Sequence, residues 1–158
     1  MAANLPYFDT SYLVRLYLRD LGFEAVRELA GSGAAVASAW HAQTEIMAAF
    51  HRGFREGRLQ QGAYCSALGQ FLTDSKNGLF QWLPLTDSIH PRLEQFFWQA
   101  PATTFLRAAD ALHLACAAEH GFKQVYSNDR HFLAAAPLFG LEGVNIIGSV
   151  ARPLTTDY

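Results

Sequence analysis

Cysteine is scarce in this sequence. Cys65 and Cys116 are the only two, and they lie far apart in segments whose apolar periodicity predicts helices. Two such residues make neither a disulfide framework nor a pair with zinc-ligand spacing. We therefore expect both to be small buried residues of a protein in a reducing compartment.

Long hydrophobic runs are also lacking. Charged residues interrupt the apolar stretches well before the roughly 20 residues that a membrane-spanning helix needs. Residues 1–6 show no basic segment leading into an apolar stretch, so no signal peptide is indicated. These two absences predict a cytoplasmic protein that has no membrane partner.

Neither sign of charge dominates. Twelve Lys and Arg residues oppose 14 Asp and Glu residues, which gives a net charge of −2. Domains that bind nucleic acid are usually basic overall, so this balance does not indicate one. It does not exclude one either, because a local basic patch can hold phosphates while acidic residues elsewhere hold a cation.

Apolar material, in contrast, is plentiful. Hydrophobic residues make up 51% of the 158 residues, which is enough to bury the core of one ordinary domain. We expect a single domain over residues 1–150, followed by a short tail over residues 151–158.

Short apolar segments alternate with segments of helical periodicity along the chain. The predicted strands are Tyr7–Phe8, Ala34–Ala39, Leu79–Leu85, Gln124–Tyr126 and Val144–Ile147. The predicted helices are a first one after Asp9, Phe23–Leu29, Ala42–Arg58, Ala63–Thr73, one after Asp87, Phe105–Glu119 with Thr103 or Thr104 as its cap, and Arg130–Ala135. Because the strands are continuously apolar, the pattern predicts an α/β fold, a three-layer α/β/α sandwich with a mainly parallel central sheet.

Four carboxylates lie at unusual positions in this pattern. Asp9 and Asp129 each follow a predicted strand, and ligand sites in open parallel sheets collect beyond the carboxyl ends of strands. Glu45 and Asp110 lie inside apolar helical stretches, where an ionised carboxylate costs free energy unless a cation or a partner compensates it. An all-oxygen ligand set predicts that Mg²⁺, or alternatively Mn²⁺, is the cation.

The segments that carry these carboxylates resemble a known family. The runs Tyr7–Ser11, Arg107–Ala115 and Ser127–Phe132, together with the helical Glu45, are similar to the four signature blocks of the PIN-domain family. Within that family they most resemble the VapC-type ribonuclease toxins of toxin–antitoxin pairs. The resemblance implies an α/β/α sandwich that hydrolyses single-stranded RNA with Mg²⁺ or Mn²⁺ and leaves a 5′-phosphate.

The resemblance also implies a role for each matching residue. Asp9 and Asp110 match the positions that hold the metal most directly. Glu45 and Asp129 match the positions that complete an acidic quartet. Ser127 matches a hydroxyl position, more often Thr in the family, that orients the pocket.

Partners are implied as well: an RNA substrate, a small antitoxin of the VapB type and a second copy of the chain in a homodimer. An arginine of the antitoxin could satisfy the acidic quartet in place of the metal. The helical hairpin over residues 42–73 carries Ile46, Phe50, Phe54 and Phe71, which could form an apolar groove for a partner helix. The alternative is that these four side chains only pack against the sheet.

Each carboxylate also has a purely structural interpretation. Asp9 and Asp129 could be helix N-caps. Glu45 could be a solvated helix residue. Asp110 could pair with Arg107 or His113 in a buried network. The ordered occurrence of all four blocks favours the functional interpretation.

Other candidate residues carry weaker signals. His113 is expected to be a packing residue or to hold a ligand in place rather than to bind the metal itself, and no spacing of the remaining histidines indicates a metal site. Arg52, Arg55 and Arg58 could bind phosphates or a partner, or they could simply be a solvated helix end. The run Phe96–Trp98 is expected in the core, with a dimer interface as the alternative.

Three hypotheses about function follow. The first is a metal-dependent endoribonuclease that acts as the toxin of a toxin–antitoxin pair. The second is a PIN-domain nuclease of RNA processing without an antitoxin, and the third is a non-catalytic PIN-like module for protein binding. The intact carboxylates argue against the third. They carry no base specificity, so they specify no RNA target.

Overall fold

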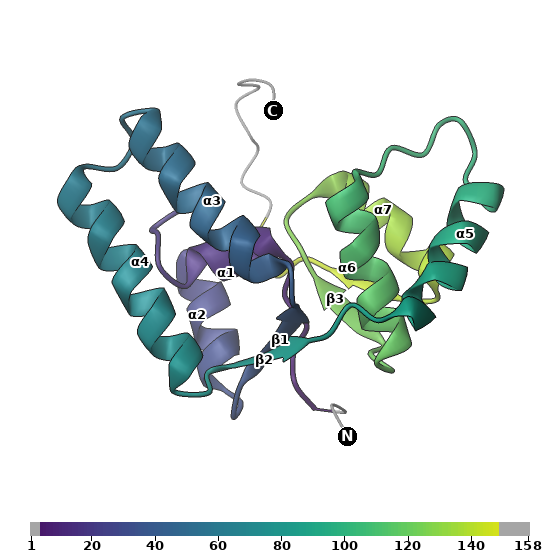
Figure 1. Ribbon diagram of the computed structural model, residues 1–158, viewed down its shortest axis with the longest axis horizontal. Helices are drawn as coiled ribbons and strands as arrows, with labels where there is room; N and C mark the ends of the chain where they lie inside the picture. Colours follow the sequence, from purple (N-terminus) through teal and green to yellow (C-terminus); the bar gives the residue numbers. More distant parts are fainter. Residues whose placement is uncertain (1–3, 149–158) are drawn as a thin grey trace.

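The computed structural model describes residues 4–148 and shows helices on both sides of a central layer of strands (Figure 1). The strands are β1 (Val36–Ala39), β2 (Phe80–Leu83), β3 (Gln124–Tyr126) and β4 (Glu142–Val144). The helices are α1 (Thr10–Arg15), α2 (Phe23–Gly31), α3 (Ala42–Arg55), α4 (Gln61–Lys76), α5 (His90–Gln99), α6 (Ala108–Glu119) and α7 (Arg130–Ala135), with 3-10 turns η1 (Asp87–Ile89) and η2 (Ala136–Phe139). The predicted tail, residues 151–158, lies outside the described residues, and the domain boundary at residue 150 stays a prediction.

The strands form a parallel layer that the segment at residues 7–8 holds together. β1 pairs with β2, and β3 pairs with β4, both in parallel. Tyr7 bridges to Ala37 of β1, and Phe8 bridges to Tyr126 of β3, again in parallel. The amide of Phe8 donates to the carbonyl of Ala37 over 3.0 Å, and the amide of Tyr126 donates to the carbonyl of Tyr7 over 2.9 Å. The order is therefore β2, β1, residues 7–8, β3, β4, which confirms the predicted parallel sheet.

Each face of this layer is covered by its own apolar core. Successive side chains of a strand point to opposite faces, so Tyr7 and Phe8 enter different cores. Phe8 packs with side chains of α1 to α4, such as Ile46 and Phe71. Tyr7 packs with those of α5 to α7, such as Leu114. Figure 1 shows the two helical layers on either side of the strands, and this arrangement confirms the predicted three-layer sandwich.

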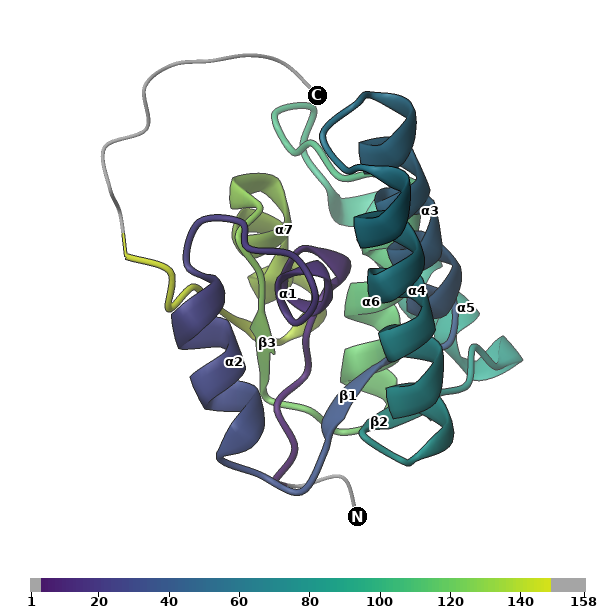
Figure 2. The same cartoon turned by 90° about the vertical axis from the view of Figure 1, so that its left-hand side faces the viewer.

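The helices α3 and α4 form the hairpin that the sequence predicts, and they lie side by side in Figure 2. Inside that hairpin, however, Ile46, Phe50 and Phe71 are at most 1% exposed. The prediction that they line a groove open to a partner is therefore wrong, and the packing alternative holds for them. Phe54 is 36% exposed and stacks on Tyr64 of α4, so it is the one of the four that reaches the surface.

The helix α6 begins later than predicted. Its first residue is Ala108 rather than Phe105, and neither Thr103 nor Thr104 caps it. The amide of Thr104 instead closes a turn onto the carbonyl of Pro101 over 2.9 Å. The later start places Asp110 in the first turn of α6, where the positive end of the helix dipole favours a carboxylate.

The last strand is also shifted, to Glu142–Val144 from the predicted Val144–Ile147. The chain leaves the sheet after Val144, because the side chain of Asn145 accepts hydrogen bonds from the Tyr12 hydroxyl over 2.8 Å and from the amide of Ile147 over 3.0 Å. The bond from Tyr12 ties this segment to α1.

The two cysteines lie in different surroundings. Cys116 is buried, as predicted, and burial raises the pKa of its thiol to about 12. Cys65 is exposed on α4, so the prediction that both are buried is wrong for this residue. Across residues 4–148, no helix combines the length and the apolar character needed to cross a membrane.

Candidate functional site

Asp9 lies where the central segment ends and α1 begins. Its carboxylate accepts hydrogen bonds at Oδ1 from the Ser11 hydroxyl over 2.6 Å and from the amide of Tyr12 over 3.1 Å. It is therefore the N-cap of α1, as one interpretation of the sequence proposed. Its side chain is only 4% exposed, and burial raises its pKa although the hydroxyls of Ser11 and Ser127 act in the opposite direction.

Ser127 connects Asp9 to a second carboxylate. Its fully buried hydroxyl donates to Oδ2 of Asp9 over 2.5 Å and accepts from the amide of Asp129 over 2.9 Å. The side chain of Asp129 in turn accepts from the amides of His131 and Phe132 over 2.7 and 3.2 Å. Asp129 is thus the N-cap of α7, and one hydroxyl fixes both the side chain of Asp9 and the backbone of Asp129.

Asp110 lies close enough to the other three carboxylates for their charges to change its pKa. Burial raises its pKa to about 6. Within that value, the charge of His113 acts to lower the pKa, whereas the charges of Asp9, Asp129 and Glu45 contribute to its rise. The structure therefore brings the four predicted carboxylates close enough for their charges to interact, and we call this group of Asp9, Glu45, Asp110 and Asp129 the acidic neighbourhood. Two of them follow segments of the sheet, and the other two lie in the first turns of α3 and α6.

Glu45 is held in place rather than freely solvated. Its Oε1 accepts from the Thr10 hydroxyl over 2.8 Å and lies 2.7 Å from Nε2 of His113. Nε2 of His41 lies 3.4 Å from the same oxygen. Burial alone would raise the pKa of Glu45, but the hydrogen bond and charge of His113, with help from Thr10, hold it below its usual value. The interpretation of Glu45 as a solvated helix residue is therefore wrong.

Two histidines lie beside Glu45. His113 was expected to be a packing or supporting residue, and it is fully buried with its Nδ1 at 2.8 Å from the Tyr7 hydroxyl. The sequence indicates no role for His41, yet its Nε2 lies 3.4 Å from Oε1 of Glu45. The i, i+4 spacing of His41 and Glu45, which puts both on one helix face, was the signal that could have found it.

Two arginines near the end of α3 pair with a glutamate of their own segment. Arg52 and Arg58 both pair with Glu56, with nitrogen-to-oxygen distances of 2.9 and 2.8 Å. All three side chains are substantially exposed. This arrangement supports the interpretation of a solvated helix end.

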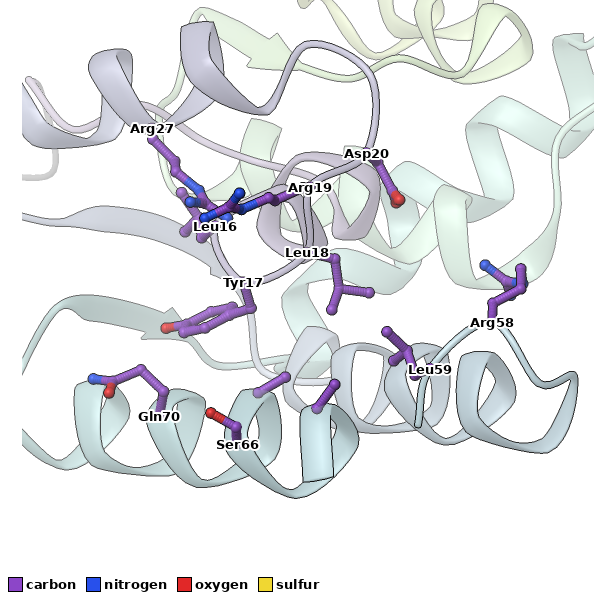
Figure 3. A pocket seen from close by; sticks show the side chains of 12 residues that line it. Leu16, Tyr17, Leu18, Arg19, Asp20, Arg27, Arg58, Leu59, Ser66 and Gln70 are labelled. Carbon is purple, nitrogen blue, oxygen red and sulfur yellow. The ribbon is translucent and has the colours of Figure 1, made fainter. Parts of the chain in front are cut away.

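A hollow of about 560 Å³ lies elsewhere, between the loop after α1 and the α3–α4 hairpin (Figure 3). Leu18 of the loop and Leu59 of the hairpin give it apolar walls. Arg19, Arg27 and Arg58 also line it. None of the four carboxylates lines this hollow. It is therefore separate from the acidic neighbourhood, and it is the concave surface that the hairpin does offer.

The donor set of the acidic neighbourhood fits a hard divalent cation. Its side chains are carboxylates, and burial raises the pKa of both Asp9 and Asp110. Ionised carboxylates that crowd together in partly buried surroundings repel one another and lose hydration, and a cation with oxygen ligands offsets both costs. Asp9 and Asp110 would hold such an ion.

Comparison with known proteins places this geometry in a family. The model of the PIN domain matches residues 7–137, which include all four carboxylates. The chain belongs to the PIN-domain family. A search of curated protein sequences returns no match.

Solved structures share the fold of this PIN domain, and one of them illustrates the likeness. It is that of VapC20 of Mycobacterium tuberculosis, named as a toxin that cleaves the sarcin–ricin loop. The likeness has a TM-score of 0.61 and covers 82% of this chain and 93% of that one, at 17% sequence identity. It confirms the α/β/α architecture that the sequence blocks imply.

Proposed function

We propose that this PIN domain is a metal-dependent endoribonuclease that hydrolyses RNA phosphodiester bonds at Asp9, Glu45, Asp110 and Asp129. The observation that carries the proposal is the environment of Asp110. Burial, together with the charges of the three other carboxylates, raises its pKa to about 6, so a cation would stabilise the group as a whole. Membership of the PIN-domain family supports the same conclusion.

Each residue of the proposed site has its own role. Asp9 and Asp110 hold the ion, for which Mg²⁺ is our first choice and Mn²⁺ the alternative. Ser127 fixes the orientation of Asp9 through its 2.5 Å hydrogen bond. Glu45 stays ionised near neutral pH because its pKa is lowered, and Asp129 completes the quartet. A bound divalent cation would offset the negative charge that develops on the phosphodiester oxygens.

We further propose that the chain acts as the toxin of a toxin–antitoxin pair. The shared fold with VapC20 supports this role, and the hollow beside the α3–α4 hairpin supports a protein partner. Its apolar walls would take an apolar segment of a small VapB-like antitoxin. An arginine of that antitoxin would then satisfy the carboxylates in place of the metal.

A homodimer and a cytoplasmic location belong to the same proposal. The run Phe96–Trp98 divides between core and surface: Phe96 is 3% exposed, whereas Phe97 and Trp98 are 60% and 89% exposed. The two exposed rings make α5 the face that we assign to the second copy. A nuclease of RNA processing without an antitoxin is the second candidate, and it shares the same site.

The experiment that tests the nuclease is substitution of the carboxylates. Asp9→Asn and Asp110→Asn remove a charge with little change in shape, and each should lower cleavage of single-stranded RNA by more than about a hundredfold, since loss even of a supporting residue around a metal ligand costs about 10- to 100-fold. Asp87→Asn, at an exposed aspartate of η1, is the matched control and should cleave as the wild type does. Undiminished cleavage by either site variant would refute the assignment.

A further inference from the structure

Two histidines meet Glu45 at the edge of the acidic neighbourhood. His41 precedes α3, Glu45 lies one turn further along that helix, and His113 lies on α6. The rings of the two histidines have centroids 4.4 Å apart. One potential ligand atom from each of the three side chains lies within 4.8 Å of the other two. His113 is fully buried, but the side chains of His41 and Glu45 are 18% and 29% exposed, so an ion in solution can reach the group.

The hydrogen bonds of Tyr7 indicate which nitrogen of His113 carries a proton. We assign the single hydroxyl proton of Tyr7 to the backbone carbonyl oxygen of His113, 3.1 Å away, because a carbonyl oxygen can only accept. The hydroxyl then accepts from Nδ1–H of His113 over 2.8 Å. In the neutral ring this leaves a lone pair on Nε2, 2.7 Å from Oε1 of Glu45. Two electron-rich atoms so close together require a cation, either a proton or a metal ion.

His41 shows a related arrangement. Its Nε2 lies 3.0 Å from the carbonyl oxygen of Ala109, to which it donates when it carries the ring proton. Its Nδ1 is then an acceptor, and it is the only buried side-chain nitrogen or oxygen in residues 4–148 without a hydrogen-bond partner. Histidines that bind metals typically direct their other ring N–H to a carbonyl or carboxylate. In both histidines one nitrogen thus donates to a neighbour and the other keeps a lone pair. Nδ1 of His41 has no partner, and Nε2 of His113 faces Oε1 of Glu45 and, at 3.4 Å, the Thr10 hydroxyl, which itself donates to that Oε1.

We propose that His41, Glu45 and His113 bind one borderline divalent transition-metal ion, of the class of Zn²⁺ or Co²⁺. Two imidazoles and one carboxylate are a ligand set that zinc takes with a fourth position open. Metal–ligand bonds of about 2.0–2.1 Å in a tetrahedron separate neighbouring ligand atoms by about 3.3 Å. Nε2 of His113 and Oε1 of Glu45 lie 2.7 Å apart, so a small side-chain movement would accommodate the ion between them. His41 would complete the ligand set through Nδ1, the ring nitrogen that its contact with Ala109 leaves free.

This site goes beyond the proposed nuclease centre, with which it shares only Glu45. Imidazole nitrogens favour zinc over magnesium, whereas the aspartates favour the hard ion, so the two sites select different metals. Because both draw on Glu45, a zinc ion here withdraws that carboxylate from the quartet. We therefore expect zinc to lower magnesium-dependent RNA cleavage.

The test measures metal binding directly, on metal-stripped protein without a histidine tag. Co²⁺ should bind as one equivalent with the visible absorption of a low-coordinate site, and one equivalent of Zn²⁺ should displace it. Calorimetric titration with Zn²⁺ should show an affinity at least about tenfold lower in His41→Ala, the expected effect of losing a residue at a metal site. His113 is fully buried, so its replacement risks unfolding, and His41→Ala therefore carries the test.

Two control proteins make the result specific. His90 and Glu94 have the same i, i+4 spacing at 3.7 Å but are both exposed, and His90→Ala should leave zinc affinity unchanged. Asp110→Asn should still bind zinc. Absence of binding, equal affinity in His41→Ala and wild type, or loss of binding in Asp110→Asn would each overturn the inference. If wild type binds zinc through His41 but cleaves no RNA with Mg²⁺, only the proposed nuclease function fails.

Discussion

The hydroxyl of Ser127 donates a 2.5 Å hydrogen bond to Oδ2 of Asp9 and so joins two carboxylate-bearing segments far apart in the sequence. The same oxygen accepts from the amide of Asp129 over 2.9 Å. Because parallel strands bring their carboxyl ends to one edge of the sheet, residues that follow β3 lie beside residues that follow the central segment. One buried hydroxyl therefore sets the distance between two members of the proposed quartet.

Removal of this hydroxyl should impair the proposed site. Ser127→Ala frees the side chain of Asp9 and leaves the amide of Asp129 without its partner, so we expect RNA cleavage to fall by about 10- to 100-fold. The unpaired buried groups should also lower the free energy of unfolding by about 1–3 kcal/mol. Ser127→Thr keeps the hydroxyl and is the matched control. Cleavage rates and urea unfolding curves check both effects, and an Ala variant as active as the Thr variant would contradict the role of Ser127.

The pKa of Asp110 predicts how stability depends on pH in metal-free protein. Its value is about 6 in the folded chain, against an ordinary value of 3.8. The folded state therefore binds the proton more tightly, so the stability that the neutral group contributes is complete below pH 3.8 and is lost as pH rises to about 6. Asp110→Asn stays neutral and should be more stable than wild type at pH 7.5 by about 1–2 kcal/mol, after allowance for the partial exposure of the carboxylate.

Urea unfolding in chelator at pH 4 and pH 7.5 measures this difference, which should be close to zero at the lower pH. Asp87→Asn, at an exposed aspartate, should match the wild type at both pH values. Excess Mg²⁺ should remove the advantage of Asp110→Asn, because the ion stabilises only the protein that retains its ligand. If Asp110→Asn were less stable than wild type at pH 7.5 in chelator, contacts within the protein alone would stabilise the ionised carboxylate of Asp110. That result would contradict the prediction.

The sequence predicts the sheet and the positions of the carboxylates better than it predicts their contacts. Continuously apolar strands correctly indicate a parallel sheet, and Asp9 and Asp129 do lie at the ends of strands. The apolar run at residues 144–147 suggested a strand, but the side chain of Asn145 accepts a hydrogen bond from Tyr12 of α1 instead. The contact between His41, just before α3, and His113 of α6 joins segments distant in the sequence, so helical periodicity alone could not reveal it.

The toxin proposal predicts a growth phenotype. Expression of the chain alone should arrest a bacterial host, because uncontrolled RNA cleavage stops protein synthesis. Co-expression of a short gene adjacent to this one, if it encodes an antitoxin, should restore growth by filling the hollow and the acidic site. Asp9→Asn, expressed at the same level, is the control that should not arrest growth. Normal growth with folded wild-type protein would remove the toxin role and leave the RNA-processing nuclease.

The most direct test of the central claim is RNA cleavage by metal-stripped wild-type protein with and without a hard divalent cation. Single-stranded RNA labelled at one end should remain intact in excess chelator. Addition of Mg²⁺ or Mn²⁺ beyond the chelator should restore cleavage and yield fragments with a 5′-phosphate, because carboxylates such as Asp9 and Asp110 supply only oxygen ligands. Cleavage that continues undiminished in chelator, or that is absent at every concentration of both ions, would contradict the account.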